Sequence, residues 1–424
     1  MTKKNQRPWA ATAADSSHQD TFIAHSRADL IVYVRQVLGF QPRNSLVLIT
    51  VCGQRLTSVL RVNLPAADIN AEQADEYLQD VLATYGERVQ NRHLLVLIFS
   101  DEHWLPDQQP PFHELFKVAR QQQKRTDGQV RFSHAYFFGA DQIDTVFPGS
   151  RHSEDATALA LDSTALNAQL TVAGFCSAKS AEEQIQRLVA APWANQTQLR
   201  NQVRLRAKRV RQFEASLNFD VRHARHLFGR LEKWDKWLRR IAATGVGSRQ
   251  DKNAAMIRHH RNDAIELVTD LEHVRTRDLV LVLASFPLMT TVAASFQHFF
   301  SEPVRNQLFK SLDPELTDTD VPAESWQINF LSRALMAATD TAPDWQRTTA
   351  CNALLRELLP IAEGDSRQAI LGLLAWSEWA MGRSSLAMVY LEKATAEDPT
   401  YRFTMLFNAL VSTGRVAEWA SREP

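Results

Sequence analysis

Acidic and imidazole side chains follow two of the expected strands, at the points where those strands end. The segment SDEHW (residues 100–104) follows one apolar run, and residues 139–144 (GADQID) follow another. Ligands of open α/β sheets bind beyond the carboxyl ends of strands, which makes Asp101, His103 and Asp141 the candidate site residues. Such groups can bind a divalent cation or transfer protons. Neighbouring residues cannot all face one ligand, however, so solvated loops are the interpretation we favour.

Ser45 is the serine most worth testing, because it stands directly before the apolar run 46–51. A hydrogen bond at a turn or helix end is the role we expect for its hydroxyl. The sequence has no G-x-S-x-G or Walker pattern, and His113-Glu114 lacks the second histidine of a HExxH helix. The three cysteines lie too far apart for a CxxC metal site. We therefore expect neither cofactor nor metal.

Charge is distributed unevenly along the chain. Residues 200–262 contain 17 Lys or Arg and 5 Asp or Glu, whereas residues 313–424 contain 9 and 16. A basic helix could follow a phosphate backbone, with contacts from four side chains: Arg204, Arg206, Lys208 and Arg209. Alternatively, the basic face is solvated or paired with the acidic C-terminal helices, and the nearby Trp234 is buried on an apolar stripe. We favour this second interpretation.

The first half of the chain alternates between strand and helix patterns. A helix with apolar residues at helical spacing covers residues 30–38, Gly39 caps it in the left-handed conformation, and Pro42 prevents its continuation. Two strands follow at 46–51 and 57–64, then a helix at 71–85. A strand at 94–99, a helix around 112–119 and a strand at 130–138 complete the pattern. The order predicts an α/β domain with a mixed sheet flanked by helices.

After Pro192 the strand patterns give way to helical spacing, which predicts an all-α remainder without strands of five or more residues. The acidic segment 313–323 is the best linker candidate. Within 371–399, three alanines fall at the spacing of a tetratricopeptide helix hairpin: Ala375, Ala387 and Ala394. Only one repeat matches well, and a plain helical hairpin is the alternative we favour.

The segment LGFQPRNSLV (residues 38–47), with the short glycine turn and the strand ending in Leu64-Pro65, resembles the start of the bacterial domain-of-unknown-function 4192 family. The resemblance extends through 166–192 and more weakly into the C-terminal helices. It implies no established reaction. Many members have a cysteine in the loop after the fourth strand, whereas residues 139–157 of this chain have none. A metal or redox role for this loop is therefore not expected.

Composition limits the architecture and the location. The 424 residues have 45% hydrophobic content, and 48 Lys or Arg balance 48 Asp or Glu. Neither nucleic acid nor membrane follows from this balance, and no segment has the ~18 uncharged apolar residues of a membrane span. We expect a cytoplasmic protein with a disordered tail (1–22), an α/β domain (23–192), a basic helical region (193–312) and a helical, tetratricopeptide-like domain (313–424).

The leading hypothesis is a non-catalytic interaction or regulatory protein that binds a protein partner or associates with itself. One alternative is nucleic-acid binding through the basic helices in 200–262. A second is a hydrolase-like or metal-dependent enzyme at the strand ends. The sequence does not decide between them, since sites assembled from distant loops leave no motif.

Overall fold

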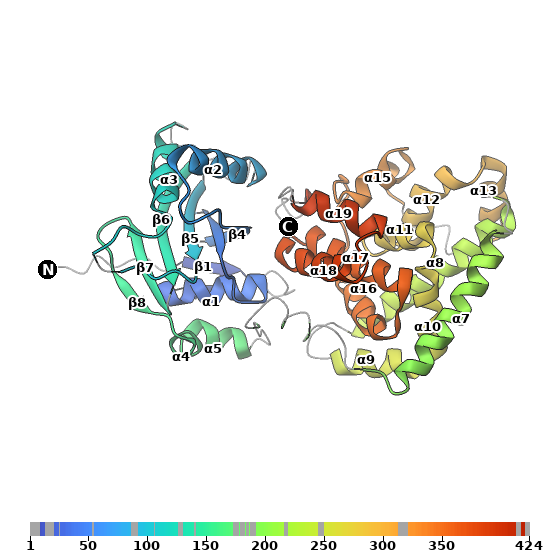
Figure 1. Ribbon diagram of the computed structural model, residues 1–424. Coiled ribbons are helices and arrows are strands. Elements are labelled where there is room, and N and C mark those ends of the chain that lie inside the picture. The colour runs from blue at the N-terminus through green and yellow to red at the C-terminus, as the bar shows by residue number, and fades with distance from the viewer. Residues whose placement is uncertain are drawn as a thin grey trace. The chain divides into compact units, whose positions relative to one another are not determined.

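The computed structural model describes most of the chain, and its elements are shown in Figure 1. The residues described are 9–12, 21–24, 26–52, 55–85, 92–105, 107–125, 130–139, 141–172, 178, 183, 186, 192–215, 219–244, 250–312, 321–412 and 417–419. The chain divides into two compact units. The first comprises Met1–Gln184 with Thr413–Arg415, and the second Ile185–Ser412 with Val416–Pro424. They are called the α/β unit and the helical unit below.

The α/β unit is built on a mixed eight-stranded sheet with the order β2-β1-β4-β3-β5-β6-β7-β8. Its strands are β1 (Trp9–Thr12), β2 (Thr21–Ala24), β3 (Ser45–Cys52), β4 (Arg55–Asn63), β5 (Arg92–Phe99), β6 (Val130–Gly139), β7 (Gln142–Phe147) and β8 (Ser153–Asp155). β3 is antiparallel to β4 and β5, and Ser45 pairs with Phe99. β5 is parallel to β6, with Phe99 beside Phe138. The start of β3 and the carboxyl ends of β5 and β6 therefore lie side by side at the same end of the sheet.

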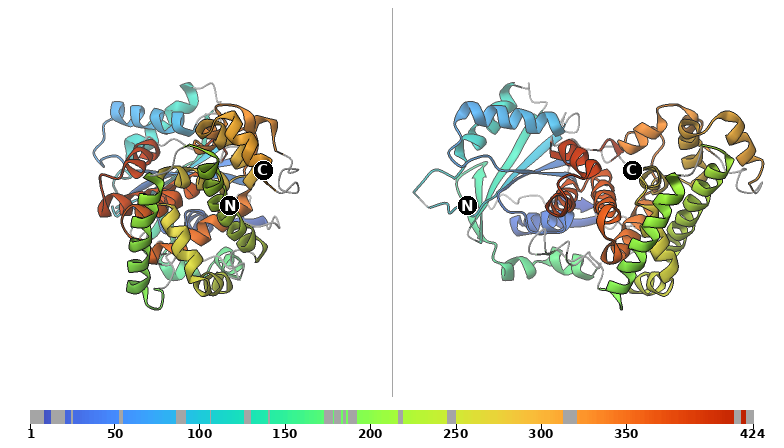
Figure 2. Two further views of the ribbon diagram at one scale, coloured as in Figure 1. Left: turned by 90° about the vertical axis from the view of Figure 1, so that its right-hand side faces the viewer. Right: turned by 45° about the vertical axis from the view of Figure 1, so that its right-hand side comes forward.

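Helices cover both faces of this sheet, as the right-hand view of Figure 2 also shows. They are α1 (Arg27–Leu38), α2 (Ala71–Tyr85), α3 (His113–Arg125), α4 (Ala158–Asp162) and α5 (Ala165–Val172). One core joins α2 and α3 to alternate residues of the sheet, such as Leu46 and Leu48. On the other face, α4 and α5 pack against α1. The predicted mixed sheet flanked by helices is confirmed.

The edges of the sheet differ from the prediction. β1 lies within the segment that we expected to be a disordered tail, and it pairs with β2 and β4. At the other edge, the expected loop 139–144 is a two-residue turn, because β7 resumes pairing with β6 at Gln142. Asp144 is consequently buried in β7, where it pairs with Arg151 at 2.9 Å. β1 and β7 have only four and six residues, so their apolar periodicity is weak.

The helical unit contains no strand among the residues that the structure describes, as predicted. Its elements are α7 (Gln196–Ala215), α8 (Val221–Thr244), α9 (Gln250–His259), α10 (Arg261–Asp270), α11 (Val274–Leu283), α12 (Leu288–Phe299), α13 (Glu302–Phe309), η2 (Ala323–Trp326), α15 (Phe330–Leu335), α16 (Trp345–Leu358), η3 (Leu359–Ile361), α17 (Gly364–Ala380), α18 (Ser384–Glu397) and α19 (Arg402–Ser412). One hydrophobic core runs from Trp193 to Trp419. The two helical regions expected on either side of residue 312 thus share a core, and most of the proposed linker, 313–320, lies outside the described residues.

The predicted hairpin corresponds to α17 and α18, which pack together along their lengths. Ala375, Ala387 and Ala394 are fully buried. A methyl group added at Gly372 would lie 2.4 Å from the ring of Phe403 in α19, so the third helix is packed equally closely. The small residues thus mark close helix contacts. Whether these helices are a tetratricopeptide repeat stays a prediction.

Candidate functional site

An open cleft of about 350 Å³ lies in the α/β unit, where the start of β3 meets the carboxyl ends of β5 and β6. This is the position at which α/β sheets bind ligands. Its polar lining consists of Arg35, Gln41, Arg43, Ser100, Asp101 and Asp141. The rings of Phe99 and Phe138, 5.3 Å apart, also line it. The fold therefore brings two of the three predicted carboxylate and imidazole residues, Asp101 and Asp141, to one cleft.

Asp101 is held at the cleft by the close approach of two strand ends. The amide of Ser100 donates to Phe138 O at 3.0 Å, and the amide of Glu102 donates to Ser100 Oγ at 3.1 Å. Gly139 makes this approach possible, since a Cβ there would lie 2.5 Å from Glu102 O. Asp101 itself is exposed. The backbone around it is therefore fixed while its carboxylate faces solvent.

Asp141 enters the cleft from the tight turn between β6 and β7. Its φ of 58° lies in the left-handed region, which aspartate tolerates better than most residues. Its carbonyl accepts a hydrogen bond from the amide of Ala156 at 2.8 Å. This bond ties the turn to the end of β8 and fixes the position of an exposed carboxylate.

The opposite charges come from α1 and the segment that follows it. Arg35 lies in the last turn of α1, and its side chain is 16% exposed. Among the residues that the structure describes, its carboxylate partner is Asp162 at 3.9 Å, which is 62% exposed. Burial lowers the pKa of Arg35, and Asp162 opposes this shift. The guanidinium is thus a largely buried cation with one distant partner.

The helix end positions two further donors. Gly39 caps α1 with φ 78°, as predicted, and the amide of Gln41 donates to Ala178 O at 3.1 Å. Gln41 Nε2 and Arg35 Nε are both buried without a hydrogen-bond partner in the described part of the chain. Arg43 is exposed and completes this wall. None of these three donors was among the predicted site residues, although Gln41 and Arg43 lie inside the segment that carries the family resemblance.

Two predicted site residues, His103 and Ser45, do not line the cleft. His103 is exposed and does not line the cleft. Ser45 is fully buried: its hydroxyl donates to Arg43 O at 2.6 Å and accepts from Arg61 Nε at 2.8 Å. Ser45 thus holds the cleft segment in place, in agreement with the expected turn hydrogen bond. The described residues contain no group of three or more His, Cys, Asp or Glu side chains placed to hold a metal ion.

The basic face of α7 is partly neutralised within the helical unit. Arg206 pairs with Glu266 at 2.7 Å, Arg211 with Glu272 at 3.4 Å, and Arg200 with Glu363 at 3.7 Å. Glu266 lies in α10 and Glu272 in the turn that follows it, and neither comes from the C-terminal helices that we expected to supply the acids. Three of the four candidate side chains, Arg204, Lys208 and Arg209, are exposed without ion pairs to described residues. The fourth is Arg206, whose pairing leaves it less available.

The tryptophans near the basic segment do not extend this surface. Trp234 is fully buried and Trp237 is 4% exposed, both within the core. Stacking on nucleic-acid bases requires an accessible ring. Burial on the apolar stripe, the favoured sequence interpretation, is therefore what the structure shows.

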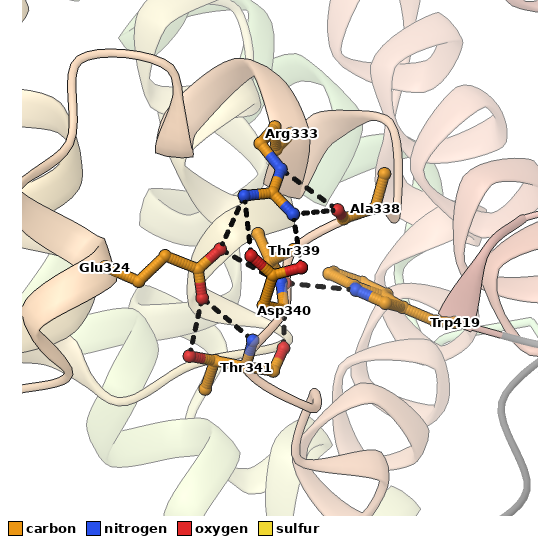
Figure 3. Close-up of polar contacts among 7 residues, drawn as sticks. All are labelled: Glu324, Arg333, Ala338, Thr339, Asp340, Thr341 and Trp419. Atoms are coloured by element: carbon orange, nitrogen blue, oxygen red, sulfur yellow. Dashed lines mark hydrogen bonds and ion pairs between the residues drawn. The ribbon is translucent and has the colours of Figure 1, made fainter.

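A second polar cluster lies in the helical unit and is shown in Figure 3. Glu324 in η2 accepts hydrogen bonds from the amides of Asp340 and Thr341 at 2.9 and 2.8 Å. Arg333 contacts Glu324 at 3.1 Å and Asp340 at 2.7 Å. Burial raises the pKa of Glu324, but these amides and Arg333 outweigh it, and the net shift is downward. The contacts fix η2 against the loop 338–341.

The segment held by this cluster presents apolar side chains to solvent. Trp326 is 51% exposed and Ile328 is 80% exposed. Neighbouring exposed apolar residues on a fixed backbone are typical of protein interaction sites, and tryptophan is enriched at their energetic centres. No signal in the sequence distinguished these residues from a loop.

The structure is thus an α/β unit with an open cleft at the strand ends, followed by a helical unit, and the described residues form no catalytic arrangement that identifies a reaction. The family model described as Domain of unknown function (DUF4192) matches residues 28–305 and 332–416. The chain belongs to this family. Searches of curated proteins and of solved structures found no match. Among the described residues, no helix is both long and apolar enough to cross a membrane.

Proposed function

We propose that this protein is a non-catalytic regulatory protein whose α/β unit binds a small ligand and whose helical unit contacts a protein partner. The cleft at the sheet edge carries the proposal. Two carboxylates, two guanidiniums and a buried amide converge there from three separate segments. The carboxylates of Asp101 and Asp141 make no ion pair with any described residue, which leaves both free to accept hydrogen bonds from a ligand.

The helical unit supports the interaction part of the proposal through Trp326 and Ile328. A protein partner is the occupant we propose for this surface, and a second copy of the chain is the alternative. Three cysteines at distant positions and no disulfide signature agree with a reducing cytoplasm, which we include in the proposal. Nucleic-acid binding through α7 and catalysis at the strand ends stay alternatives.

A ligand screen on a cleft-blocking variant tests the first part. Ala158 is exposed and lines the cleft, so Ala158→Trp should fill it without disturbing the core. The matched control is Ala168→Trp, at an exposed position of α5 that does not line the cleft. Thermal shifts measured with a mixed library of small metabolites should reveal stabilisers that lose their effect in Ala158→Trp and keep it in Ala168→Trp.

Two outcomes would overturn the proposal. Absence of any stabiliser, or stabilisers that act equally on both variants, would show that the cleft is not a ligand site. Mass spectrometry of each stabiliser after incubation with the protein tests the non-catalytic part. Chemical conversion that is lost in Ala158→Trp would establish the enzyme alternative instead.

A further inference from the structure

We propose that the ligand of the cleft is a small phosphorylated polyol, with its phosphoryl group on the Arg35, Gln41 and Arg43 wall and its hydroxyl groups facing Asp101 and Asp141. This inference rests on the proposed ligand-binding function and specifies its chemistry. The donors come from α1 and the segment after it, with Arg35 Nε and Gln41 Nε2 unpartnered within the described part of the chain, and the carboxylates of Asp101 and Asp141 follow β5 and β6.

The first wall has hydrogen-bond donors without acceptors. Arg35 Nε and Gln41 Nε2 are buried and find no acceptor among the described residues. A buried donor that loses its water costs free energy unless another acceptor replaces that water. The partner of Arg35 at 3.9 Å lies beyond hydrogen-bond distance and is mostly in solvent. An anion in the cleft would instead compensate the poorly paired charge of Arg35, whose side chain is 16% exposed.

The charge and number of these donors favour a phosphoryl group over a carboxylate. Arg35 and Arg43 together carry two positive charges, and a phosphate monoester carries about −1.5 to −2 at neutral pH. Two guanidiniums and an amide offer more N–H groups than two carboxylate oxygens can accept in plane, whereas three phosphoryl oxygens point in different directions. The wall therefore matches a tetrahedral dianion better than a planar monoanion.

The second wall requires donors on the same ligand. Asp101 and Asp141 are exposed acceptors on fixed backbone, and they would repel a second anionic group. A ligand with phosphate at one end and hydroxyl groups at the other avoids this repulsion. Phe138, which is half-buried and lines the cleft, offers ring surface for the C–H groups of a polyol chain or sugar ring. About 350 Å³ is at the small end of ligand pockets.

Isothermal titration calorimetry with ribose 5-phosphate, ribose, inorganic phosphate and gluconate tests the ligand class. Glycerol 3-phosphate and glucose 6-phosphate extend the first arm to other polyol lengths. We expect at least one phosphorylated polyol to bind, with affinity at least ~10-fold above that of inorganic phosphate or of its unphosphorylated counterpart. Arg35→Met should weaken this binding by ~10-fold or more, and Asp141→Asn by a smaller factor. Lys117→Met, at an exposed position of α3 outside the cleft, is the matched control and should leave it unchanged.

The outcomes separate this inference from the function on which it rests. Gluconate or ribose binding that is lost in Ala158→Trp, without binding of any phosphorylated polyol, would overturn the inference and leave a ligand-binding cleft. Phosphate-ester binding undiminished in Arg35→Met would also overturn it. If Arg35→Met fails to fold, Arg43→Ala and Gln41→Leu take its place, and each should weaken the phosphorylated polyol. Failure of every probe would overturn the inference, while the metabolite screen decides the broader proposal.

Discussion

Buried charged side chains have close ion-pair partners in the core of the helical unit, whereas Arg35 in the cleft of the α/β unit has only a distant one among the described residues. In the helical unit, the fully buried Glu378 contacts Arg356 at 2.8 Å and Arg383 at 2.6 Å. Arg35 in the cleft is 16% exposed and has one carboxylate at 3.9 Å. A buried charge without a close partner is costly. The paired charges therefore stabilise the fold, and the poorly paired guanidinium is an observation on which the proposed ligand rests.

The largest effect should come from removing the shared carboxylate of the helical unit. Glu378→Ala leaves Arg356 and Arg383 without it and also removes an acceptor for Asn352 Nδ2 at 2.9 Å. Breaking a buried ion pair in this way typically costs about 3–5 kcal/mol. Urea unfolding followed by tryptophan fluorescence measures the loss. Glu392→Ala, at an exposed position of α18, is the control and should change stability by less than ~0.5 kcal/mol.

In the cleft, removing a charge should leave the free energy of unfolding unchanged or raise it slightly. Arg35→Met replaces a poorly paired, largely buried cation by an apolar side chain and should change the free energy of unfolding by between 0 and about +1 kcal/mol. Arg27 on the same helix is its matched control, because it is 10% exposed and pairs with Glu154 at 2.7 Å. Arg27→Met should cost about 1–3 kcal/mol. Equal losses in the two variants, measured by circular dichroism in urea, would remove the distinction between paired and unpaired charge.

Acidic pH should destabilise the helical unit through two histidines. Burial lowers the pKa of His226 and of His273 to about 4, with neighbouring arginines adding to the shift. The folded state therefore binds fewer protons than the unfolded state between pH 6.5 and about 4. The stabilisation is fully present above pH 6.5 and is lost as the pH falls through this window. Melting temperatures across it should fall, and the double variant His226→Gln with His273→Gln should show a flatter pH dependence.

Local patterns predicted the central layers of both units. Continuous and alternating apolar patterns identified the four central strands. Gly39 and Pro42 marked the end of α1, because glycine permits the left-handed cap and proline prevents the helix from continuing. We expected a longer loop at Asp141, because the short strand β7 has no clear apolar pattern. In the structure, β7 begins at Gln142 and pairs with the end of β6. A single sequence does not reveal the register in which neighbouring strands pair. This register decides whether the ends of two strands lie side by side.

The cleft was predicted in part for the same reason. Asp101 and Asp141 follow strands, so the carboxyl-end rule placed them at one edge. Arg35 escaped notice because helical spacing alone assigns it to a solvated face, whereas α4 and α5 cover this helix. Gln41 and Arg43 looked like ordinary residues after a helix end. Burial of a donor is a tertiary property and leaves no trace in local spacing.

The exposed basic side chains of α7 allow a test of the nucleic-acid alternative. We expect no salt-sensitive, submicromolar nucleic-acid complex, so replacing Arg204, Arg206, Lys208 and Arg209 together by alanine should leave the mobility of a nucleic-acid probe unchanged. Electrophoretic mobility shifts at ~50 and ~200 mM salt measure it, since phosphate contacts make binding steeply salt-dependent. A submicromolar, salt-sensitive complex that the quadruple variant abolishes would establish the nucleic-acid alternative.

The smallest effects are expected at the two carboxylates of the cleft. Asp101→Asn and Asp141→Asn should each change the free energy of unfolding by less than ~0.5 kcal/mol, because both side chains are exposed and asparagine also tolerates the positive φ at Asp141. Asp141→Val provides the contrast, since a β-branched residue is strained at φ 58° and should cost about 1–3 kcal/mol. Melting temperatures with Mg²⁺, Mn²⁺ or Zn²⁺ add a second test. If a cation stabilises the native protein but not the Asp101→Asn, Asp141→Asn double variant, the carboxylates bind metal, and the enzyme alternative gains over a purely regulatory cleft.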